Sequence, residues 1–325
     1  PAPDISRRHA RPSGGGGGMS GAGGEFSDVM AGHNILAISR PVEVWRATSR
    51  MRGIHSQRIV SMCVRRQLIY ICTADHNGRD HKVFCWNANG SSKAEEIELG
   101  RDALGAGAGG ASGSEQRPNI FLDPTGQHCF ICGADGDNFY VSMRSTRARR
   151  LTAWQGVHVT AVAFDPDTCS ESGVGSMLIG SASGSLYEGS WGPNARDIRF
   201  ENLHVLDQAA TPRVTEIHLE RIVGDGGGVA LFILLSTAGP TRLYHFIGPG
   251  PLPELFKAHR SGGGLTAYTE LPGSLPGSAE RVIYRAGEGT RQFAMLTAHG
   301  IYNGSVLHSV PAAAAAAAAQ GQHGG

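Results

Sequence analysis

Residues 119–143 read NIFLDPTGQHCFICGADGDNFYVSM. Two short apolar runs lie on either side of a sequence in which Asp123 and Pro124 precede a threonine and Gly126. Proline presets φ at the second position of a β-turn and glycine closes the turn, so the two runs are expected to pair as antiparallel strands. A third apolar run follows further glycines and carries the aromatic Tyr140. The stretch therefore predicts a unit of three consecutive antiparallel strands.

The same three-strand unit recurs along the chain, and its third strand carries an aromatic residue each time. These aromatics, Phe84, Tyr140, Tyr187, Tyr244 and Tyr302, follow one another roughly every 55 residues, the length of a four-stranded propeller blade with enlarged loops. The first strands are expected at 58–63, 119–122, 159–164, 214–219 and 281–284, the second at 67–72, 127–132, 177–181, 229–236 and 291–297, and the third at 82–86, 139–143, 185–188, 242–247 and 301–306.

This recurrence predicts an all-β fold, a β-propeller of four-stranded blades. Five blades are clear, and an incomplete earlier unit is expected at 35–38 and 42–46. We expect about six or seven blades in the native domain and expect this chain to end before the last of them, which would leave a strand edge open. A β-sandwich or a pair of small barrels is the alternative, but the similar register of the repeated units favours the propeller.

Three segments have a composition typical of disordered chain. Residues 1–26 form a Gly- and Arg-rich tail, 105–113 are almost entirely Gly, Ala and Ser, and 311–325 contain eight consecutive alanines and a Gly-rich end. None has the varied apolar surface that offsets the entropy of ordering. We therefore assign the propeller to residues 27–310, with 105–113 as an insert.

The charge balance and the hydropathy pattern argue against several classes of protein. Lys and Arg total 29 and Asp and Glu total 28, a net charge of +1, which is unlike the basic excess of a nucleic-acid binder. The longest apolar run, 229–235, is far shorter than the ~18 residues of a membrane-spanning helix. The first 26 residues lack the apolar stretch of a signal peptide, so a cytoplasmic protein is expected.

The cysteines point to ordinary packing. Six are present, and a cytosolic chain of this size is not expected to build a disulfide framework from them. Only Cys129 and Cys132 are close in sequence, whereas a structural zinc site takes about four ligands, usually from two such pairs. In a strand, a spacing of three places the two side chains on opposite faces. We interpret both as buried thiols and expect no metal and no cofactor.

Sequence motifs of catalysis are not recognisable. Residues 180–184 resemble the Gly-x-Ser-x-Gly elbow of a hydrolase, but alanine takes the central position. No Gly-x-x-x-x-Gly-Lys-Ser/Thr loop and no His-Glu-x-x-His pair occurs. Asn89 and Asn303 each begin an Asn-Gly-Ser glycosylation pattern, which we interpret as a turn. No catalytic residue is assigned, and an enzyme with acidic or histidine side chains around the channel is the weakest alternative.

Four arginines crowd one connection: Arg144, Arg147, Arg149 and Arg150, with no acidic residue among them. Guanidinium groups bind phosphate and carboxylate, so this connection is a candidate contact for an anionic partner such as a phosphoinositide head group. A solvated loop between blades explains the same residues, and we favour that interpretation. The residues expected to be structural are Trp154, buried at the entry to a blade; Tyr140, Tyr187, Tyr244 and Tyr302, packed between sheets; and Asp123, Pro124 and Gly126 in the turn.

Seven segments, taken in order, resemble the propeller of one family. They are 97–101 (IELGR), 121–126 (FLDPTG), 151–156 (LTAWQG), 178–188 (LIGSASGSLYE), 199–206 (RFENLHVL), 242–248 (RLYHFIG) and 300–304 (GIYNG). No blade ends in Trp-Asp, so the WD-repeat signature does not apply. The collinear order resembles the N-terminal region of the deep orange family of vacuolar protein sorting subunits, from about residue 58 to 308.

The resemblance implies a large subunit made of a propeller, an α-solenoid and a C-terminal zinc-binding RING. This chain would supply the propeller only, so any ubiquitin-ligase activity of the RING would lie outside it. The insert at 105–113 is longer than the family's usual connection.

The family's role implies a non-catalytic scaffold of the HOPS and CORVET tethering complexes. These complexes act in vesicle docking and membrane fusion at the late endosome and the vacuole or lysosome. The implied partners are the other class C subunits and, through them, Rab GTPases and SNAREs, with peripheral membrane association and no nucleic acid. A propeller adaptor of a coat or a nuclear-pore assembly is the alternative, because those proteins also join propellers to solenoids.

Overall fold

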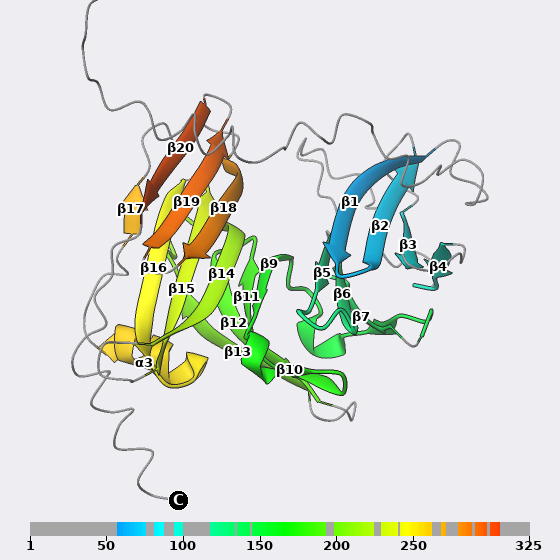
Figure 1. The fold of residues 1–325 in the computed structure, drawn as a ribbon, viewed down its shortest axis with the longest axis horizontal. Helices are drawn as coiled ribbons and strands as arrows, with labels where there is room; N and C mark the ends of the chain where they lie inside the picture. The colour runs from blue at the N-terminus through cyan, green and yellow to red at the C-terminus, as the bar shows by residue number, and fades with distance from the viewer. Residues whose placement is uncertain are drawn as a thin grey trace, which may run out of the picture. The chain divides into compact units, whose positions relative to one another are not determined.

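The computed structural model describes residues 57–75, 81–87, 94–99, 118–133, 135–143, 145–192, 198–223, 229–239, 241–261, 268–270, 279–287, 290–297 and 300–305 of the 325. Within these ranges the chain forms five antiparallel sheets, each built from strands that are consecutive in sequence, and one α-helix (Figure 1). The segments 1–26, 105–113 and 311–325, whose composition is typical of disordered chain, and the incomplete unit expected at 35–38 and 42–46 lie outside the described residues.

The first two sheets each contain four strands in sequence order. Every pairing within them is antiparallel, as tight connections between neighbouring strands require. The first sheet consists of β1 (Gln57–Arg65), β2 (Leu68–Asp75), β3 (Lys82–Asn87) and β4 (Glu95–Ile97), and the second of β5 (Asn119–Leu122), β6 (His128–Cys132), β7 (Asn138–Ser142) and β8 (Arg149–Arg150).

The third sheet has five strands because a short extra strand, β10 (Cys169–Ser170), pairs with the beginning of β11 (Gly173–Ser181). The remainder of β11 pairs with β9 (Val159–Phe164) on one side and with β12 (Ser185–Trp191) on the other, and β13 (Ile198–Val205) follows outside β12. A 3-10 turn, Thr152–Trp154, leads from the second sheet into the third.

The fourth sheet consists of β14 (Arg213–Val223), β15 (Val229–Ala238), β16 (Arg242–Pro249) and β17 (Tyr268–Glu270), and the fifth of β18 (Ala279–Gly287), β19 (Thr290–Thr297) and β20 (Gly300–Ser305). The helix α3 (Leu252–Ser261) connects β16 to β17 and contacts β13 and β16. Leu252, Leu255 and Phe256 are spaced to lie on one side of this helix, and all three are buried.

The second strands of the first four sheets, β2, β6, β11 and β15, are largely buried on both faces, and β6 shows the consequence most clearly. Cys129 and Ile131 belong to the core shared with the first sheet, whereas Phe130 and Cys132 belong to the core shared with the third. Side chains alternate between the faces of a strand, so one continuous apolar run serves two cores. The expectation that Cys129 and Cys132 point to opposite faces is confirmed.

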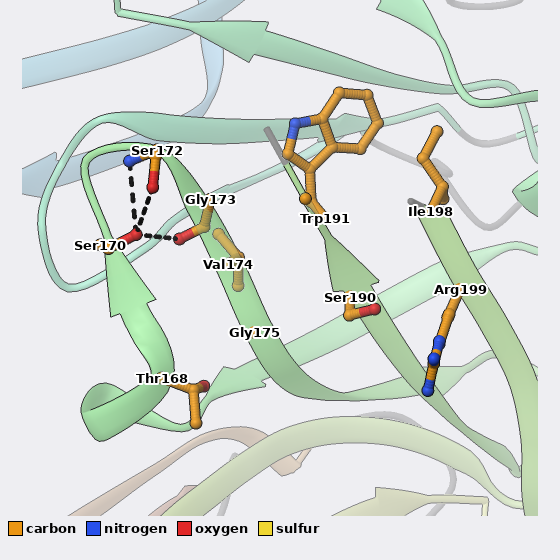
Figure 2. Close-up of a pocket in the computed structure, with 11 residues that line it drawn as sticks. Thr168, Ser170, Ser172, Gly173, Val174, Gly175, Ser190, Trp191, Ile198 and Arg199 are labelled. Atoms are coloured by element: carbon orange, nitrogen blue, oxygen red, sulfur yellow. Dashed lines mark hydrogen bonds between the residues drawn. The ribbon is translucent and has the colours of Figure 1, made fainter. Parts of the chain in front are cut away.

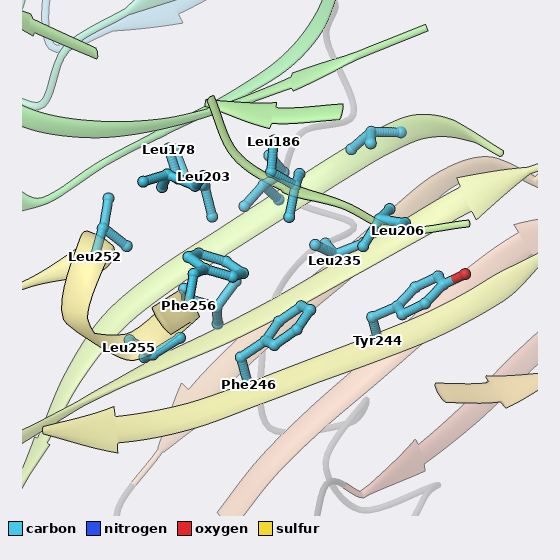
Figure 3. Close-up of a cluster of buried hydrophobic side chains, with 14 of the residues drawn as sticks. Leu178, Leu186, Leu203, Leu206, Leu235, Tyr244, Phe246, Leu252, Leu255 and Phe256 are labelled. Carbon is cyan, nitrogen blue, oxygen red and sulfur yellow. The ribbon is translucent and has the colours of Figure 1, made fainter. Parts of the chain in front are cut away.

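Four apolar clusters join the five sheets in sequence order: first to second, second to third, third to fourth, and fourth to fifth. Figure 3 shows the third of these clusters, in which Leu252, Leu255 and Phe256 of α3 lie beside Phe246 of β16. The first strands of successive sheets are also in contact, β1 with β5, β5 with β9, β9 with β14 and β14 with β18. Sheets that pack face to face in this order are the blades of a β-propeller, and we number them one to five.

The turn that suggested the fold is formed as expected. Gly126 donates a hydrogen bond from its backbone N to Asp123 O at 3.0 Å and has φ +75°. The buried carboxylate of Asp123 accepts from the backbone N of Thr125 at 3.0 Å and of His128 at 2.8 Å, which fixes the start of β6. Pro124 occupies the second turn position.

The expected first, second and third strands of all five blades are present, with ends that differ by a few residues. Two features depart from the expectation. The third blade has an additional short strand, β10, besides its four. Asn303, interpreted as the start of a turn, lies within β20 instead, because its backbone pairs with Ala294. Asn89 lies outside the described residues.

Candidate functional site

The described arginines singled out in the sequence lie in the connection from β7 to β8 of the second blade and in β8 itself. Residues 145–148, which we call the strap, lie against the end of the first blade. Glu98 donates from its backbone N to Thr146 O at 2.8 Å, and Ala148 donates from its backbone N to Glu98 O at 3.0 Å. Glu98 and Arg147 thus form a parallel bridge between two blades.

Each described arginine of this connection has a partner. Arg147 Nε lies 3.5 Å from Glu98 Oε2, with 85% and 70% of the two side chains exposed. Arg150 forms an ion pair with Asp137. The guanidinium carbon of Arg149 lies 5.6 Å from the centre of the Trp191 ring, within the range of a cation–π contact. Arg144 lies outside the described residues, and contact with an anionic partner stays a prediction.

Stacked aromatic rings fill the contact between the second and third blades. Trp154 is completely buried and stacks on Phe130, with centroids 5.4 Å apart and planes 6° apart, and on Phe200 at 5.3 Å. Tyr140 stacks on Trp191 at 3.8 Å. Large flat rings in offset contact contribute more than their buried area alone. Trp154 therefore packs between the second and third blades and holds them together.

Buried polar groups complete the same contact. His128 Nε2 lies 2.9 Å from Ser170 O, and Nδ1 lies 2.7 Å from the hydroxyl of Tyr140. Because a carbonyl only accepts, the Nε2–H of His128 donates to Ser170 O, and Nδ1 is hydrogen-bonded to the Tyr140 hydroxyl. Asn138 Nδ2 donates to Trp154 O at 2.7 Å and to Val157 O at 2.9 Å, which holds the 3-10 turn in place.

Ion pairs link the later blades. The buried carboxylate of Asp165 accepts from Arg221 Nε at 3.1 Å and Nη2 at 2.5 Å, a two-pronged contact between the third and fourth blades. This hydrogen bonding raises the pKa of Arg221, so its guanidinium stays protonated. Tyr284 of the fifth blade donates to Glu220 of the fourth at 3.0 Å.

A groove of about 620 Å³ opens beside β10 and the ends of β11 and β12 (Figure 2). Its hydroxyl groups are used within the fold. Ser170 Oγ lies 3.0 Å from Ser172 Oγ and donates to Gly173 O at 3.2 Å, and Thr168 Oγ1 accepts from the backbone N of Ser176 at 2.9 Å. Arg199 is the charged residue of the lining, which contains no carboxylate and no histidine. This lining provides no acid–base pair.

The first strands of four blades surround a second cavity of about 650 Å³. Its lining is mostly aliphatic and aromatic, with Arg65, Glu216 and His218 as the charged or titratable members besides Cys63. No group of three or more His, Cys, Asp or Glu side chains suited to a metal occurs among the described residues. Within the same ranges, no helix has the length and apolar character needed to cross a bilayer.

Burial raises the pKa of five of the six cysteines, Cys72, Cys85, Cys129, Cys132 and Cys169. Burial raises the pKa of Cys72 and of Cys169 to about 12, and it raises the pKa of Cys129 and Cys132 as well. A thiol that stays protonated is a poor nucleophile and a poor metal ligand. The six cysteines are free thiols.

The structural residues named from the sequence occupy the contacts between blades to different degrees. Tyr140 and Tyr244 are buried at 8% and 1% exposure, whereas Tyr187 is half-buried and stacks on Phe200 at 4.6 Å. The side chain of Tyr302 lies outside what the structure describes. The sequence analysis did not single out Asn138, Asp165 and Trp191, because their partners lie on other blades and no local pattern marks them.

Repeated antiparallel blades, sealed by one apolar cluster per neighbouring pair, define a β-propeller domain. Residues 47–319 match the family model described as the Pep3/Vps18/deep orange beta-propeller domain. The chain belongs to this family.

Similar proteins carry vacuolar sorting names. Vacuolar sorting protein 18 of Arabidopsis thaliana is 27% identical over 210 residues, 62% of this chain and 20% of that protein. The vacuolar protein sorting-associated protein 18 homologues are 28% identical over 137 residues in Danio rerio, 40% of this chain and 13% of that protein, and 31% identical over 90 residues in Drosophila melanogaster, 23% and 9%. The chain thus spans a fifth or less of the length of these relatives.

The crystal structure of the Cps50 (Swd1) β-propeller domain of Myceliophteria thermophila is similar with a TM-score of 0.41 and 11% identity. The similarity covers 74% of this chain and 62% of that one.

Proposed function

We propose that the chain is the propeller of a non-catalytic scaffold subunit of a membrane-tethering complex at the endosome and the vacuole or lysosome. The observation that carries the proposal is the family match over residues 47–319, together with relatives named for vacuolar sorting. HOPS- and CORVET-type complexes are the assemblies that this family implies. Vesicle docking and vacuolar protein transport would be the processes supported.

The chemistry of the cavities supports a role without catalysis. The groove at the third blade uses its hydroxyl groups within the fold, and the cavity among the first strands is lined mainly by apolar side chains. Such surfaces suit packing and protein contact better than proton transfer. The subunit would reside in the cytoplasm, peripheral to the endosomal and vacuolar membrane, and bind other class C subunits there.

Affinity purification of the tagged full-length protein tests the proposal. Other class C tethering subunits are expected to be recovered with it, and Rab GTPases and SNAREs at lower yield because they bind through those subunits. A tagged version without residues 47–319 serves as the comparison and reports what the propeller contributes. Recovery of coat or nuclear-pore components without tethering subunits would contradict the proposal in favour of an adaptor of that other type.

A further inference from the structure

The strap carries two exposed hydroxyl residues, Ser145 and Thr146, within a run of seven residues that holds four arginines and no acid. Serine/threonine kinases select substrates largely by the charge around the acceptor hydroxyl. Arg144 precedes Ser145, and Arg147 follows two positions later. We propose that Ser145 is a phosphorylation site for a kinase that recognises basic side chains.

Local geometry favours Ser145 over its neighbour. Its Oγ accepts a hydrogen bond from the backbone N of Arg147 at 3.1 Å and donates to Arg147 O at 3.4 Å, both within the same turn. Modification of this hydroxyl therefore breaks hydrogen bonds within its own turn and leaves the described contacts between blades in place. Thr146 is fixed more firmly, because its carbonyl accepts from Glu98 on the first blade at 2.8 Å.

The chemical step is an ordinary phosphoryl transfer. The Oγ of Ser145 attacks the γ-phosphorus of ATP, a new P–O bond forms, the bond to the β-phosphate oxygen breaks, and ADP leaves. The proton of the hydroxyl passes to the catalytic base of the kinase.

The added charge acts on the contact between the first two blades. Phosphoserine carries roughly −2 at neutral pH and attracts guanidinium groups strongly. Arg147 is the described arginine nearest to Ser145 in sequence, and its present partner is the exposed carboxylate of Glu98. An exposed ion pair of this kind contributes little, so the phosphate draws Arg147 away and then repels Glu98. Phosphorylation thereby loosens the strap.

The first experiment incubates the purified chain with ATP and the catalytic domain of protein kinase C, followed by peptide mass spectrometry. Phosphate is expected on Ser145, and Ser145→Ala should remove it. Arg147→Gln should lower incorporation about ten-fold, whereas Arg199→Gln, at an exposed arginine of β13, should leave it unchanged. Ser183 is the internal control, since it is exposed in a turn without arginines.

Three outcomes would overturn the site. They are equal phosphate on Ser183, unchanged incorporation in Ser145→Ala, and phosphate on the denatured chain alone. Hydrogen exchange on the phosphorylated protein tests the effect on the strap. The amides of Glu98 and Ala148, which donate across the contact, should exchange about five-fold faster. Unchanged exchange at both amides would show that modification does not alter the strap.

Discussion

On the face of the second blade that packs on the third, Phe130 and Tyr140 stack on two tryptophans, whereas the face that packs on the first carries Cys129, aliphatic side chains and a single ring, Phe139. Both faces include side chains from the same five-residue strand, β6. The two faces differ because the side chains that alternate along β6 are of different kinds. Stacked rings need one geometry, whereas thiols and aliphatic groups adapt to several.

The polar contacts at the two faces differ in the same way. Between the second and third blades, buried His128 and Asn138 reach backbone carbonyls of the neighbouring segment. Between the first and second, the strap lies in solvent and its ion pair is exposed. Buried hydrogen bonds are costly to break, and exposed ion pairs are not. We infer that the contact between the second and third blades is fixed and that the contact between the first and second blades can be adjusted.

The largest expected effect is at Trp154. Trp154→Ala removes a completely buried ring from between two others and should cost about 3–5 kcal/mol of unfolding free energy. Urea unfolding of the purified chain measures this loss. Trp154→Phe is the matched control. Its cost should be clearly smaller, because Trp154 Nε1 has no hydrogen-bond partner among the described residues and a phenyl ring keeps the stacking.

An unchanged unfolding midpoint in Trp154→Ala would show that the stacked rings do not stabilise the contact between the second and third blades. The residue would then be a surface group, and its interpretation as a binding contact would return.

The second effect concerns the polar part of the same contact. Asn138→Ala removes the side-chain donor shared by the carbonyls of Trp154 and Val157 and should cost about 2 kcal/mol. Asn202→Ala, on the exposed side of β13, is the control and should stay within about 0.5 kcal/mol of the wild type. Equal losses in both variants would mean that Asn138 does not hold the turn.

The third effect is a loss of unfolding free energy at high pH. The thiols between the first and second blades should contribute more to it than the thiol between the second and third. Burial raises the pKa of Cys72 to about 12 and that of Cys129 well above the ordinary thiol value. The folded state therefore holds these protons more tightly than the unfolded state. The resulting stability is complete below the ordinary thiol pKa and falls as pH rises beyond it, by up to about 1.4 kcal/mol per pH unit for each thiol.

Urea midpoints between pH 8 and pH 10 test this expectation. The double variant Cys72→Ala/Cys129→Ala should show a flatter decline than the wild type. Cys132→Ala, which removes a buried thiol from the opposite face of β6, should flatten it less, because one group is lost there instead of two. A decline that is identical in all three proteins would show that these buried thiols do not cause the loss of stability at high pH.

The smallest effect is expected for lipid binding by the arginines. If they bound an anionic membrane, each would contribute about 1 kcal/mol at low salt, and replacing Arg144, Arg147, Arg149 and Arg150 by Ala would abolish flotation with liposomes. We expect no flotation of either protein at near-physiological salt, because the described arginines already have partners and the net charge is only +1. Strong flotation that disappears in the quadruple variant would show that expectation to be wrong.

The sequence predicted those elements whose pattern is local. Alternating or continuous apolar runs and the Asp123–Gly126 turn marked the first three strands of every blade. The fourth strands of the first, second and fourth blades escaped because β4 and β17 have three residues each and β8 has two, too few for any periodicity. The helix α3 has ten residues and begins beside prolines, so its pattern is short.

The candidate site was less predictable because its partners are distant in sequence. Arg147 was visible as part of a basic run, but its partner Glu98 belongs to another blade, and only the fold brings the two together. The cation–π contact of Arg149 with Trp191 could not be predicted for the same reason, because the two residues belong to different blades. A run of like charge indicates a surface, and the fold decides whether that surface is neutralised.

The order of the apolar clusters has a consequence for synthesis on the ribosome. Each cluster joins two blades that are consecutive in the chain, so the contact that stabilises a blade is complete as soon as the next one has emerged. Nearest-neighbour coupling of this kind lets structure propagate from the first blade onward while translation continues. The leucine-rich contact of the third and fourth blades depends on α3, which follows β16, so that pair is finished only after the helix has left the exit tunnel.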